Sequence, residues 1–175
     1  MKSRDIAIAG ILLATGAIVR YISLAVPGPI VSNLVIAFYC LAVILIVPTF
    51  GEAVGIGVVA GILCALISHS VFPPANLVSE PVGAAVCLLA YMVLKGRTGI
   101  APGAATLVAT LASGTTFVLI AILGIAPVIL TKYASIGVFA MTTVPIVVIT
   151  AAVNAVIAQA LSVPASRALN RGRER

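Results

Sequence analysis

The stretch from Ser68 to Gly83 concentrates the side chains that could bind or ionise. It contains the only histidine of the chain, His69, together with Asn76 and Glu80. Three prolines bracket these side chains, and on both sides lie apolar runs long enough to cross a bilayer. A carboxylate in such surroundings is costly unless it meets a partner or a ligand. The stretch therefore predicts one wall of a small-molecule site.

The composition around this stretch is that of an integral membrane protein. Of 175 residues, 62% are hydrophobic and 8% are charged, and the mean hydropathy is +1.30. A soluble core needs no such apolar excess. The formal charge of +6 comes from basic residues at the ends of apolar runs, which favours contact with lipid head groups and not with nucleic acid. The three cysteines are isolated and predict packing residues, with no metal site.

Hydropathy and proline positions divide the chain into six apolar runs. We expect an all-α integral membrane protein, with six transmembrane helices in a compact bundle. It would be a single domain over residues 1–175, with a short basic tail from about residue 165. The last two runs exceed about 25 residues and contain Pro127 and Pro145, which predict kinks or tilt. The predicted spans are residues 6–26, 30–47, 51–70, 75–94, 102–130 and 135–163.

The basic residues predict the orientation of the chain. With six spans both termini lie on one face, and that face carries most of the positive charge, while the other holds only Arg20 and Lys132. The positive-inside rule then predicts cytoplasmic termini in the cell (plasma) membrane. The basic residues on the terminal side are Lys2, Arg4, Lys95, Arg97, Arg167, Arg171, Arg173 and Arg175.

Three loops on the outer face supply polar groups that can converge on one ligand. A carboxylate, two cations, amides and phenols suit a zwitterion or a heteroaromatic vitamin held in an otherwise apolar pocket. The candidate substrate-binding residues are Arg20, Asn33, His69, Asn76, Glu80, Lys132 and Tyr133.

Several of these residues have a structural alternative. Arg20 and Lys132 can extend to lipid phosphates, and Glu80 can pair with Arg20 only to stabilise the bundle. His69 can be a polar cap near the membrane surface. Asn76 can be the N-cap of the fourth span, a position that asparagine fills readily.

No motif in the sequence predicts catalysis. There is no Gly-x-Ser-x-Gly, no His-Glu-x-x-His and no phosphate-binding loop with its lysine. We therefore expect neither an enzyme nor a bound cofactor. Ser113 to Thr116 form a small polar patch in the fifth span, and Asn154 and Gln159 lie in the sixth. These residues predict packing or hydrogen bonds between helices.

The first span has a face of small residues. Gly10, Ala14 and Ala17 fall on one side at helical spacing, and this flat side can admit another helix at short distance. That helix can belong to a partner chain or to the same bundle, and the sequence does not decide between them.

Four short segments carry a family resemblance. They are the run from Gly10 to Arg20, the Pro-Gly-Pro turn at 27–29, the pair Gly57 and Gly61, and Pro-x-Asn-x-x-x-Glu at 74–80. In a six-span chain of this size they resemble the substrate-binding S component of energy-coupling factor (ECF) vitamin importers. The segments are most similar to the subgroup associated with tryptophan transport.

The resemblance implies a function and a set of partners. An S component captures a small vitamin-like or amino-acid-like solute from outside. It releases the solute inward when coupled to a transmembrane T component and two ATPase subunits, which are other chains. The resemblance implies that the face of Gly10, Ala14 and Ala17 docks on the T component, although the family has alanine where this chain has Gly10. It also implies that the outer loops at 27–33, 69–76 and 132–133 close over the solute.

Two other functions are compatible with the same residues. One is a stand-alone secondary transporter in which Glu80 is the proton-coupling carboxylate. The other is a structural membrane subunit that binds no ligand. Uptake by the purified chain alone separates the first of these from an S component.

Overall fold

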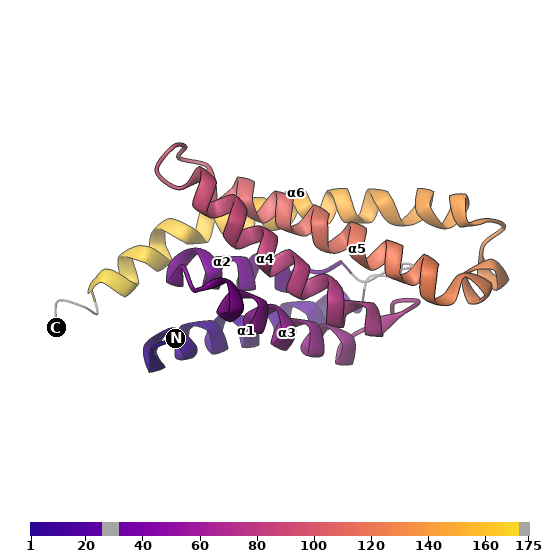
Figure 1. Ribbon diagram of the computed structural model, residues 1–175, viewed down its shortest axis with the longest axis horizontal. Coiled ribbons are helices and arrows are strands. Elements are labelled where there is room, and N and C mark those ends of the chain that lie inside the picture. Colours follow the sequence, from indigo (N-terminus) through magenta and orange to yellow (C-terminus); the bar gives the residue numbers. More distant parts are fainter. Residues whose placement is uncertain (26–31, 172–175) are drawn as a thin grey trace.

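A computed structural model describes residues 1–25 and 32–171 of the chain, with side chains as far as Leu169. The described residues form helices and no strand, which confirms the all-α class (Figure 1). The turn at 27–29 and the end of the basic tail lie outside the described residues. The elements are α1 (Ser3–Ser23), α2 (Val35–Ile46), α3 (Phe50–Leu66), the 3-10 turn η1 (Pro73–Ala75), α4 (Asn76–Leu94), α5 (Ala101–Lys132) and α6 (Ile136–Arg171).

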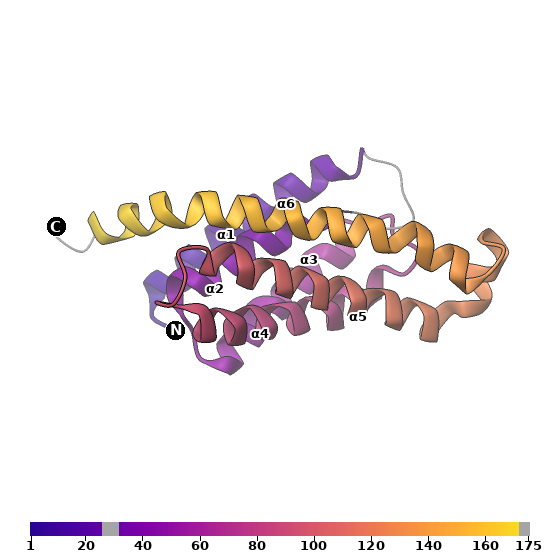
Figure 2. The same cartoon turned by 90° about the horizontal axis from the view of Figure 1, so that it is seen from above.

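The helices run roughly along one long axis. The start of α1 and the end of α6 lie at the same end of the molecule, and the turn between α5 and α6 lies at the other (Figure 1). The same hairpin projects beyond the remaining helices when the molecule is seen from above (Figure 2). We call the first end the terminal end and the second the hairpin end. The connection between α4 and α5, which contains Lys95 and Arg97, also lies at the terminal end (Figure 1).

Four of the helical segments are long and apolar enough to cross a membrane. They are 3–23, 73–94, 101–132 and 136–169. The expectation of six full spans is not confirmed, because α2 has 12 residues and α3 has 17. At 1.5 Å per residue these helices are ~18 and ~26 Å long, against a hydrocarbon core of ~30 Å. The structure thus has four candidate spans and two shorter apolar helices.

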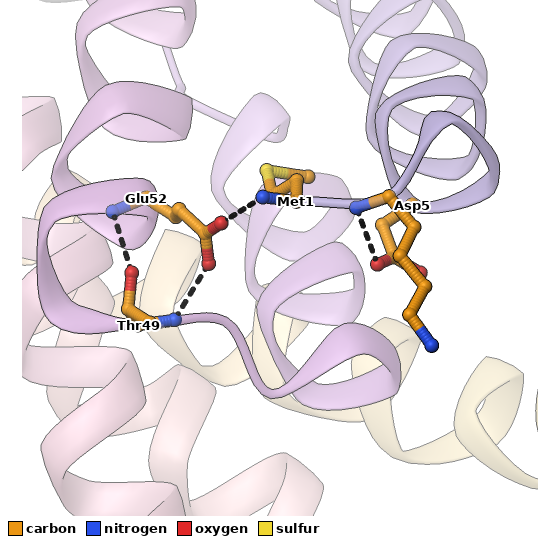
Figure 3. A network of polar contacts seen from close by, with 5 residues as sticks. Met1, Asp5, Thr49 and Glu52 are labelled. Carbon is orange, nitrogen blue, oxygen red and sulfur yellow. Dashed lines mark hydrogen bonds and ion pairs between the residues drawn. The ribbon is translucent and has the colours of Figure 1, made fainter.

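The short connection between α2 and α3 explains where α2 ends and where α3 begins. Val47 takes a left-handed conformation (φ 49°) and Pro48 follows it, so α2 cannot continue. Thr49 then caps α3: its main-chain N–H donates to Glu52 Oε2 at 2.8 Å, and its hydroxyl accepts the Glu52 N–H at 3.4 Å. The Met1 amine bonds the other oxygen of the same carboxylate (Figure 3).

The helix α2 is the centre of the bundle. Its residues from Val35 to Ile44 are buried, and it packs against each of the other five α-helices. Because its neighbours surround it, α2 needs neither a polar face nor the length of a bilayer. The main hydrophobic cluster is built around it, with side chains from α1, α3, α4 and α5.

The helix α1 lies at the side of the bundle. It buries one face against α2 and α3, and Gly16 allows close approach to α2, since a Cβ there would lie 3.2 Å from the Val35 Cα. Its opposite face is exposed and apolar. The large exposed side chains on α1 are Ile6, Ile11, Ile18, Tyr21 and Ile22.

Glycines bring α3 and α4 together. A Cβ at Gly57 would lie 2.6 Å from the Pro81 Cα, and a Cβ at Gly61 would lie 2.6 Å from the Asn76 carbonyl oxygen. Such backbone contact through small residues four apart is the usual packing of membrane helices. It sets the position of the first two turns of α4, which carry Asn76 and Glu80.

The long helix α5 is kinked, as its proline predicts. Ile125 has non-helical angles (φ −137°, ψ 30°) two residues before Pro127. Beside the kink a second hydrophobic cluster joins α5 to the chain before α4, where the Phe72 ring approaches Gly124. The hairpin end thus has a small hydrophobic core of its own, separate from the main cluster around α2.

Candidate functional site

A pocket lies between the helices, near the ends of α1, α3 and the start of α4. Its cavity volume is about 40 Å³, and the space between the lining atoms is about 410 Å³ when the part open to solvent is included. On α5 and α6 the lining residues are midway along each helix, so the hairpin end extends beyond the pocket. The lining residues are Arg20, Asn33, Ile36, Ser70, Asn76, Glu80, Thr110, Ser113, Gly114, Phe117, Val147 and Thr150.

Four of the predicted binding residues line this pocket. Arg20 comes from the last turn of α1, Asn33 from just before α2, and Asn76 and Glu80 from the first two turns of α4. These residues are far apart in the sequence, and the packing of α1 and α4 on α2 and α3 brings them together around one pocket.

Arg20 is held by the end of α3. It is 1% exposed, and it donates from Nε to the Ile67 carbonyl at 2.8 Å and from Nη2 to the Cys64 carbonyl at 3.1 Å. A cation at a helix C-terminus satisfies unpaired carbonyls and favours the helix dipole. Its third nitrogen, Nη1, is buried and has no hydrogen-bond partner among the described residues.

Glu80 is bonded through one oxygen only. Its Oε1 accepts a hydrogen bond from Asn33 Nδ2 at 2.6 Å and a longer one from the Ser79 hydroxyl at 3.3 Å. The residue is 1% exposed, and Oε2 has no hydrogen-bond partner in the described part of the chain. A buried carboxylate oxygen without a donor is costly, so this atom is a natural point of contact for a ligand.

The expected ion pair between Arg20 and Glu80 is not formed. In the described ranges of the chain, the ion pair within 4 Å joins the Met1 amine and Glu52. Instead, Arg20 directs Nε and Nη2 to the two carbonyls at the end of α3, and only Nη1 is left over. As a result, two residues that line the pocket each have one buried polar atom without a partner among the described residues, Nη1 of Arg20 and Oε2 of Glu80.

Asn76 is not the N-cap of α4. It is the first residue of the helix, and Ala75 stands at the N-cap position without a side-chain bond. The Asn76 side chain is 2% exposed and donates backwards, from Nδ2 to the Pro73 carbonyl at 2.7 Å. It therefore fixes the turn that precedes α4 while it lines the pocket.

Three predicted residues lie away from the pocket. His69 is exposed in the loop after α3, and Lys132 is exposed at the end of α5, about four helical turns beyond Phe117. Tyr133 packs edge-to-face on Phe139, with the ring centroids 5.3 Å apart. The expectation that all three outer loops meet at one depth is wrong for this structure, because α5 and α6 are much longer than the other helices.

Hydroxyl groups on α5 and α6 complete the pocket, and the sequence interpretation missed them. Thr110 and Ser113 come from α5, and Thr150 comes from α6. The sequence contains a pattern that could have identified them: Thr106, Thr110 and Ser113 recur at helical spacing, so they share one face of a mostly apolar helix. The Ser113–Thr116 patch does also pack, since Gly114 lies against Val147.

The two polar residues of the sixth span form hydrogen bonds between helices, as predicted. Asn154 Nδ2 donates to the Asn33 carbonyl at 2.9 Å and to the Thr110 hydroxyl at 3.3 Å. Gln159 accepts from the Gly103 N–H and donates to the Gly99 carbonyl, both at 3.0 Å. Asn154 therefore ties α6 to the pocket, whereas Gln159 ties α6 to the loop before α5.

The small-residue face of α1 points away from the bundle. Gly10 and Ala14 are exposed and Ala17 is half-buried, and a Cβ added at Gly10 would meet no atom within 4 Å. In the described structure Gly10 therefore does not serve packing inside the bundle.

The pocket combines polar and apolar side chains. It is lined by an arginine, a glutamate, four residues with hydroxyl groups and an apolar wall formed by Ile36, Phe117 and Val147. A few placed polar groups in an apolar cavity are typical of a small-molecule site. No group of three His, Cys, Asp or Glu side chains in the described residues is placed to hold a metal ion.

Comparisons of the chain with models of protein families, with curated proteins and with solved structures gave no significant match.

Proposed function

We propose that the chain is the substrate-capture (S) subunit of an ECF-type ABC importer. It takes up a small vitamin-like or amino-acid-like solute from outside. It releases the solute inward when a T component and two ATPase subunits, all of them other chains, engage it. The terminal end faces the cytoplasm in this proposal, and the pocket opens toward the outside of the plasma membrane.

The observation that carries the proposal is the pair of unsatisfied polar atoms in the pocket. Arg20 Nη1 and Glu80 Oε2 are both buried and lack a partner among the described residues. Leaving such groups unpaired costs about 1–3 kcal/mol each, and more when they are charged. A solute with one acceptor and one donor group would satisfy both atoms at once, which gives the site an affinity that a purely structural bundle would not need.

The outer face of α1 supports the second half of the proposal. Gly10 and Ala14 are exposed on α1, whose start lies at the terminal end, so a coupling chain from the cytoplasmic side could pack along this helix. Close approach through small residues is a common way for membrane helices to associate.

Calorimetry with the purified protein tests the binding step. L-tryptophan is the first probe, because the resemblance is to the subgroup associated with its transport, and mass spectrometry of co-purified solutes identifies other candidates. Glu80→Gln should weaken affinity by about 1.5–3 kcal/mol, the size of a bond to a charged group. This corresponds to roughly tenfold or more in dissociation constant. It should leave the melting temperature of the solute-free protein nearly unchanged.

Glu52→Gln is the matched control. It makes the same substitution at the opposite, terminal end, where Glu52 caps α3, so solute affinity should stay at the wild-type value. Equal affinity of wild type and Glu80→Gln for the solute would remove Glu80 from the site.

A second function has one observation in its favour. Glu80 is a buried carboxylate with a free oxygen in a pocket, as expected of a proton-coupling residue in a secondary transporter. Proteoliposomes that contain this chain alone decide between the two functions. Accumulation of solute driven by a pH gradient, without ATP or other chains, would favour the secondary transporter over the S subunit.

A further inference from the structure

Asn33 is bonded on three sides at the point where the chain enters α2. Its Nδ2 donates to Glu80 Oε1 at 2.6 Å, and its Oδ1 accepts the Cys64 Sγ–H at 3.4 Å. Its main-chain carbonyl accepts a hydrogen bond from Asn154 Nδ2 at 2.9 Å. These contacts connect Asn33 to α3, α4 and α6. Both ends of its side-chain amide are therefore committed to protein groups.

The bond to Glu80 decides which carboxylate oxygen is left without a protein partner. Asn33 approaches Oε1 much more closely than the Ser79 hydroxyl does, at 2.6 Å against 3.3 Å, and short bonds to a charged acceptor are the strong ones. With Oε1 held in this way, rotation of the carboxylate is restricted and Oε2 keeps one direction. Holding a binding group in its bound orientation beforehand reduces the cost of ordering it when a ligand arrives.

We propose that Asn33 is a positioning residue: it holds Glu80 through Oε1, so that Oε2 contacts the bound solute, and does not touch the solute itself. This inference rests on the proposed function, because it gives the ligand contact to Glu80. It also changes the role that the sequence predicted for Asn33, which was direct contact with the substrate.

Exchanging donor and acceptor across the bond tests the proposal without any solute. Asn33→Asp places two carboxylates at hydrogen-bond distance, so the solute-free protein should melt roughly 5 °C or more below wild type at neutral pH. Adding Glu80→Gln restores a donor–acceptor pair of reversed polarity, and the double variant should recover most of this loss. Ser79→Ala removes the weaker donor to the same oxygen and is the matched control, with a change of about a degree or less.

Binding of L-tryptophan then separates positioning from a purely structural bond. The double variant has the pair again, but position 80 carries a neutral amide, so its dissociation constant should remain roughly tenfold or more above wild type. Recovery of both melting temperature and affinity in the double variant would overturn the proposal, because the bond would then serve the fold alone.

Two further results are decisive in other ways. A wild-type melting temperature in Asn33→Asp would show that Asn33 does not hold Glu80, and would overturn the proposal whatever the solute. Failure of the wild-type protein to bind L-tryptophan or any co-purified solute would count against the proposed function instead. The melting temperatures of the single and double variants would still decide whether Asn33 holds Glu80.

Discussion

The helices α1 and α2 are neighbours in the sequence and in space, but their surroundings differ. Helix α2 is buried from Val35 to Ile44 and contacts all the other α-helices, although it is only 12 residues long. Helix α1 has 21 residues and lies against α2 and α3 with one face, while its other face is exposed. The more enclosed helix is thus the shorter one, and the more peripheral helix is the one that could span a bilayer.

The difference shows what hydrophobicity does in a membrane protein. Lipid tails are as apolar as a protein core, so a helix that faces lipid needs no polar outer face. The enclosed helix α2 is nevertheless the more uniformly apolar of the two, and single residues at the ends of the helices mark how each is placed. In α1 this residue is Arg20, whose burial orients the helix, and in α2 the early stop is at Val47 and Pro48.

Removing the anchor of α1 should have the largest effect on stability. Arg20→Ala deletes two hydrogen bonds from a buried cation to carbonyls at the end of α3. At about 1.5–3 kcal/mol for each bond to a charged group, we expect the protein in detergent to lose about 3 kcal/mol or more. Thermal unfolding followed by circular dichroism measures the loss.

The control for this variant lies on the same helix. Arg4→Ala removes an exposed arginine whose Nη2 donates to the Leu169 carbonyl at 2.7 Å, and it should leave the melting temperature close to wild type. If both variants melt alike, Arg20 does not anchor α1, and the contrast between a tethered α1 and an enclosed α2 fails.

The second prediction compares the same substitution on the two helices. Ala42 on α2 is fully buried, so Ala42→Leu forces extra methyl groups into a packed core and should cost about 1–3 kcal/mol. Ala14 on α1 is exposed, so Ala14→Leu should stay within about 0.5 kcal/mol of wild type. Urea or thermal unfolding of both variants gives the difference. Equal costs would mean that the outer face of α1 is covered in the folded chain.

The sequence predicted the class of the fold, the approximate helix positions and the kink in α5, because apolar runs and prolines act locally. It did not predict that α2 stops short of a full span. A run of 18 mostly apolar residues at 30–47 is close to the length of a span whether or not neighbours enclose it. Enclosure depends on contacts with five other helices, which no local pattern encodes.

Of the candidate binding residues, only some line the pocket, again because local patterns do not encode contacts between distant helices. Arg20, Asn33, Asn76 and Glu80 were recognised as costly polar residues at one end of apolar runs, and this cost holds in any arrangement. Their partners were not recognised, since Asn33 meets Asn154 across 121 positions of sequence. The alternative in which Arg20 pairs with Glu80 is not what the structure shows, since Arg20 donates to main-chain carbonyls, which no side-chain pattern predicts.

Lys132 and Tyr133 show the limit of reasoning from loop order. Both follow the fifth span and were placed at the depth of the other outer loops. The pocket lies at Thr110 to Phe117, and α5 continues to Lys132, so the loop lies about 20 Å further along the axis. The length of α5, and not the side of the bundle on which its loop lies, thus determines which of its residues line the pocket.

The last prediction concerns the exposed face of α1 and has the smallest expected effect on the chain itself. A Cβ at Gly10 meets no atom within 4 Å, so Gly10→Leu should fold like wild type and bind solute with unchanged affinity. If this face is the coupling surface, the bulky side chain prevents close approach of a partner helix. The variant should then lose co-purification with the T component and ATP-dependent uptake. Gly55→Leu, on an equally open position of α3, is the control and should retain both. Loss of folding or solute binding in Gly10→Leu would show that the face packs inside the chain, whereas full coupling in this variant would place the coupling surface elsewhere.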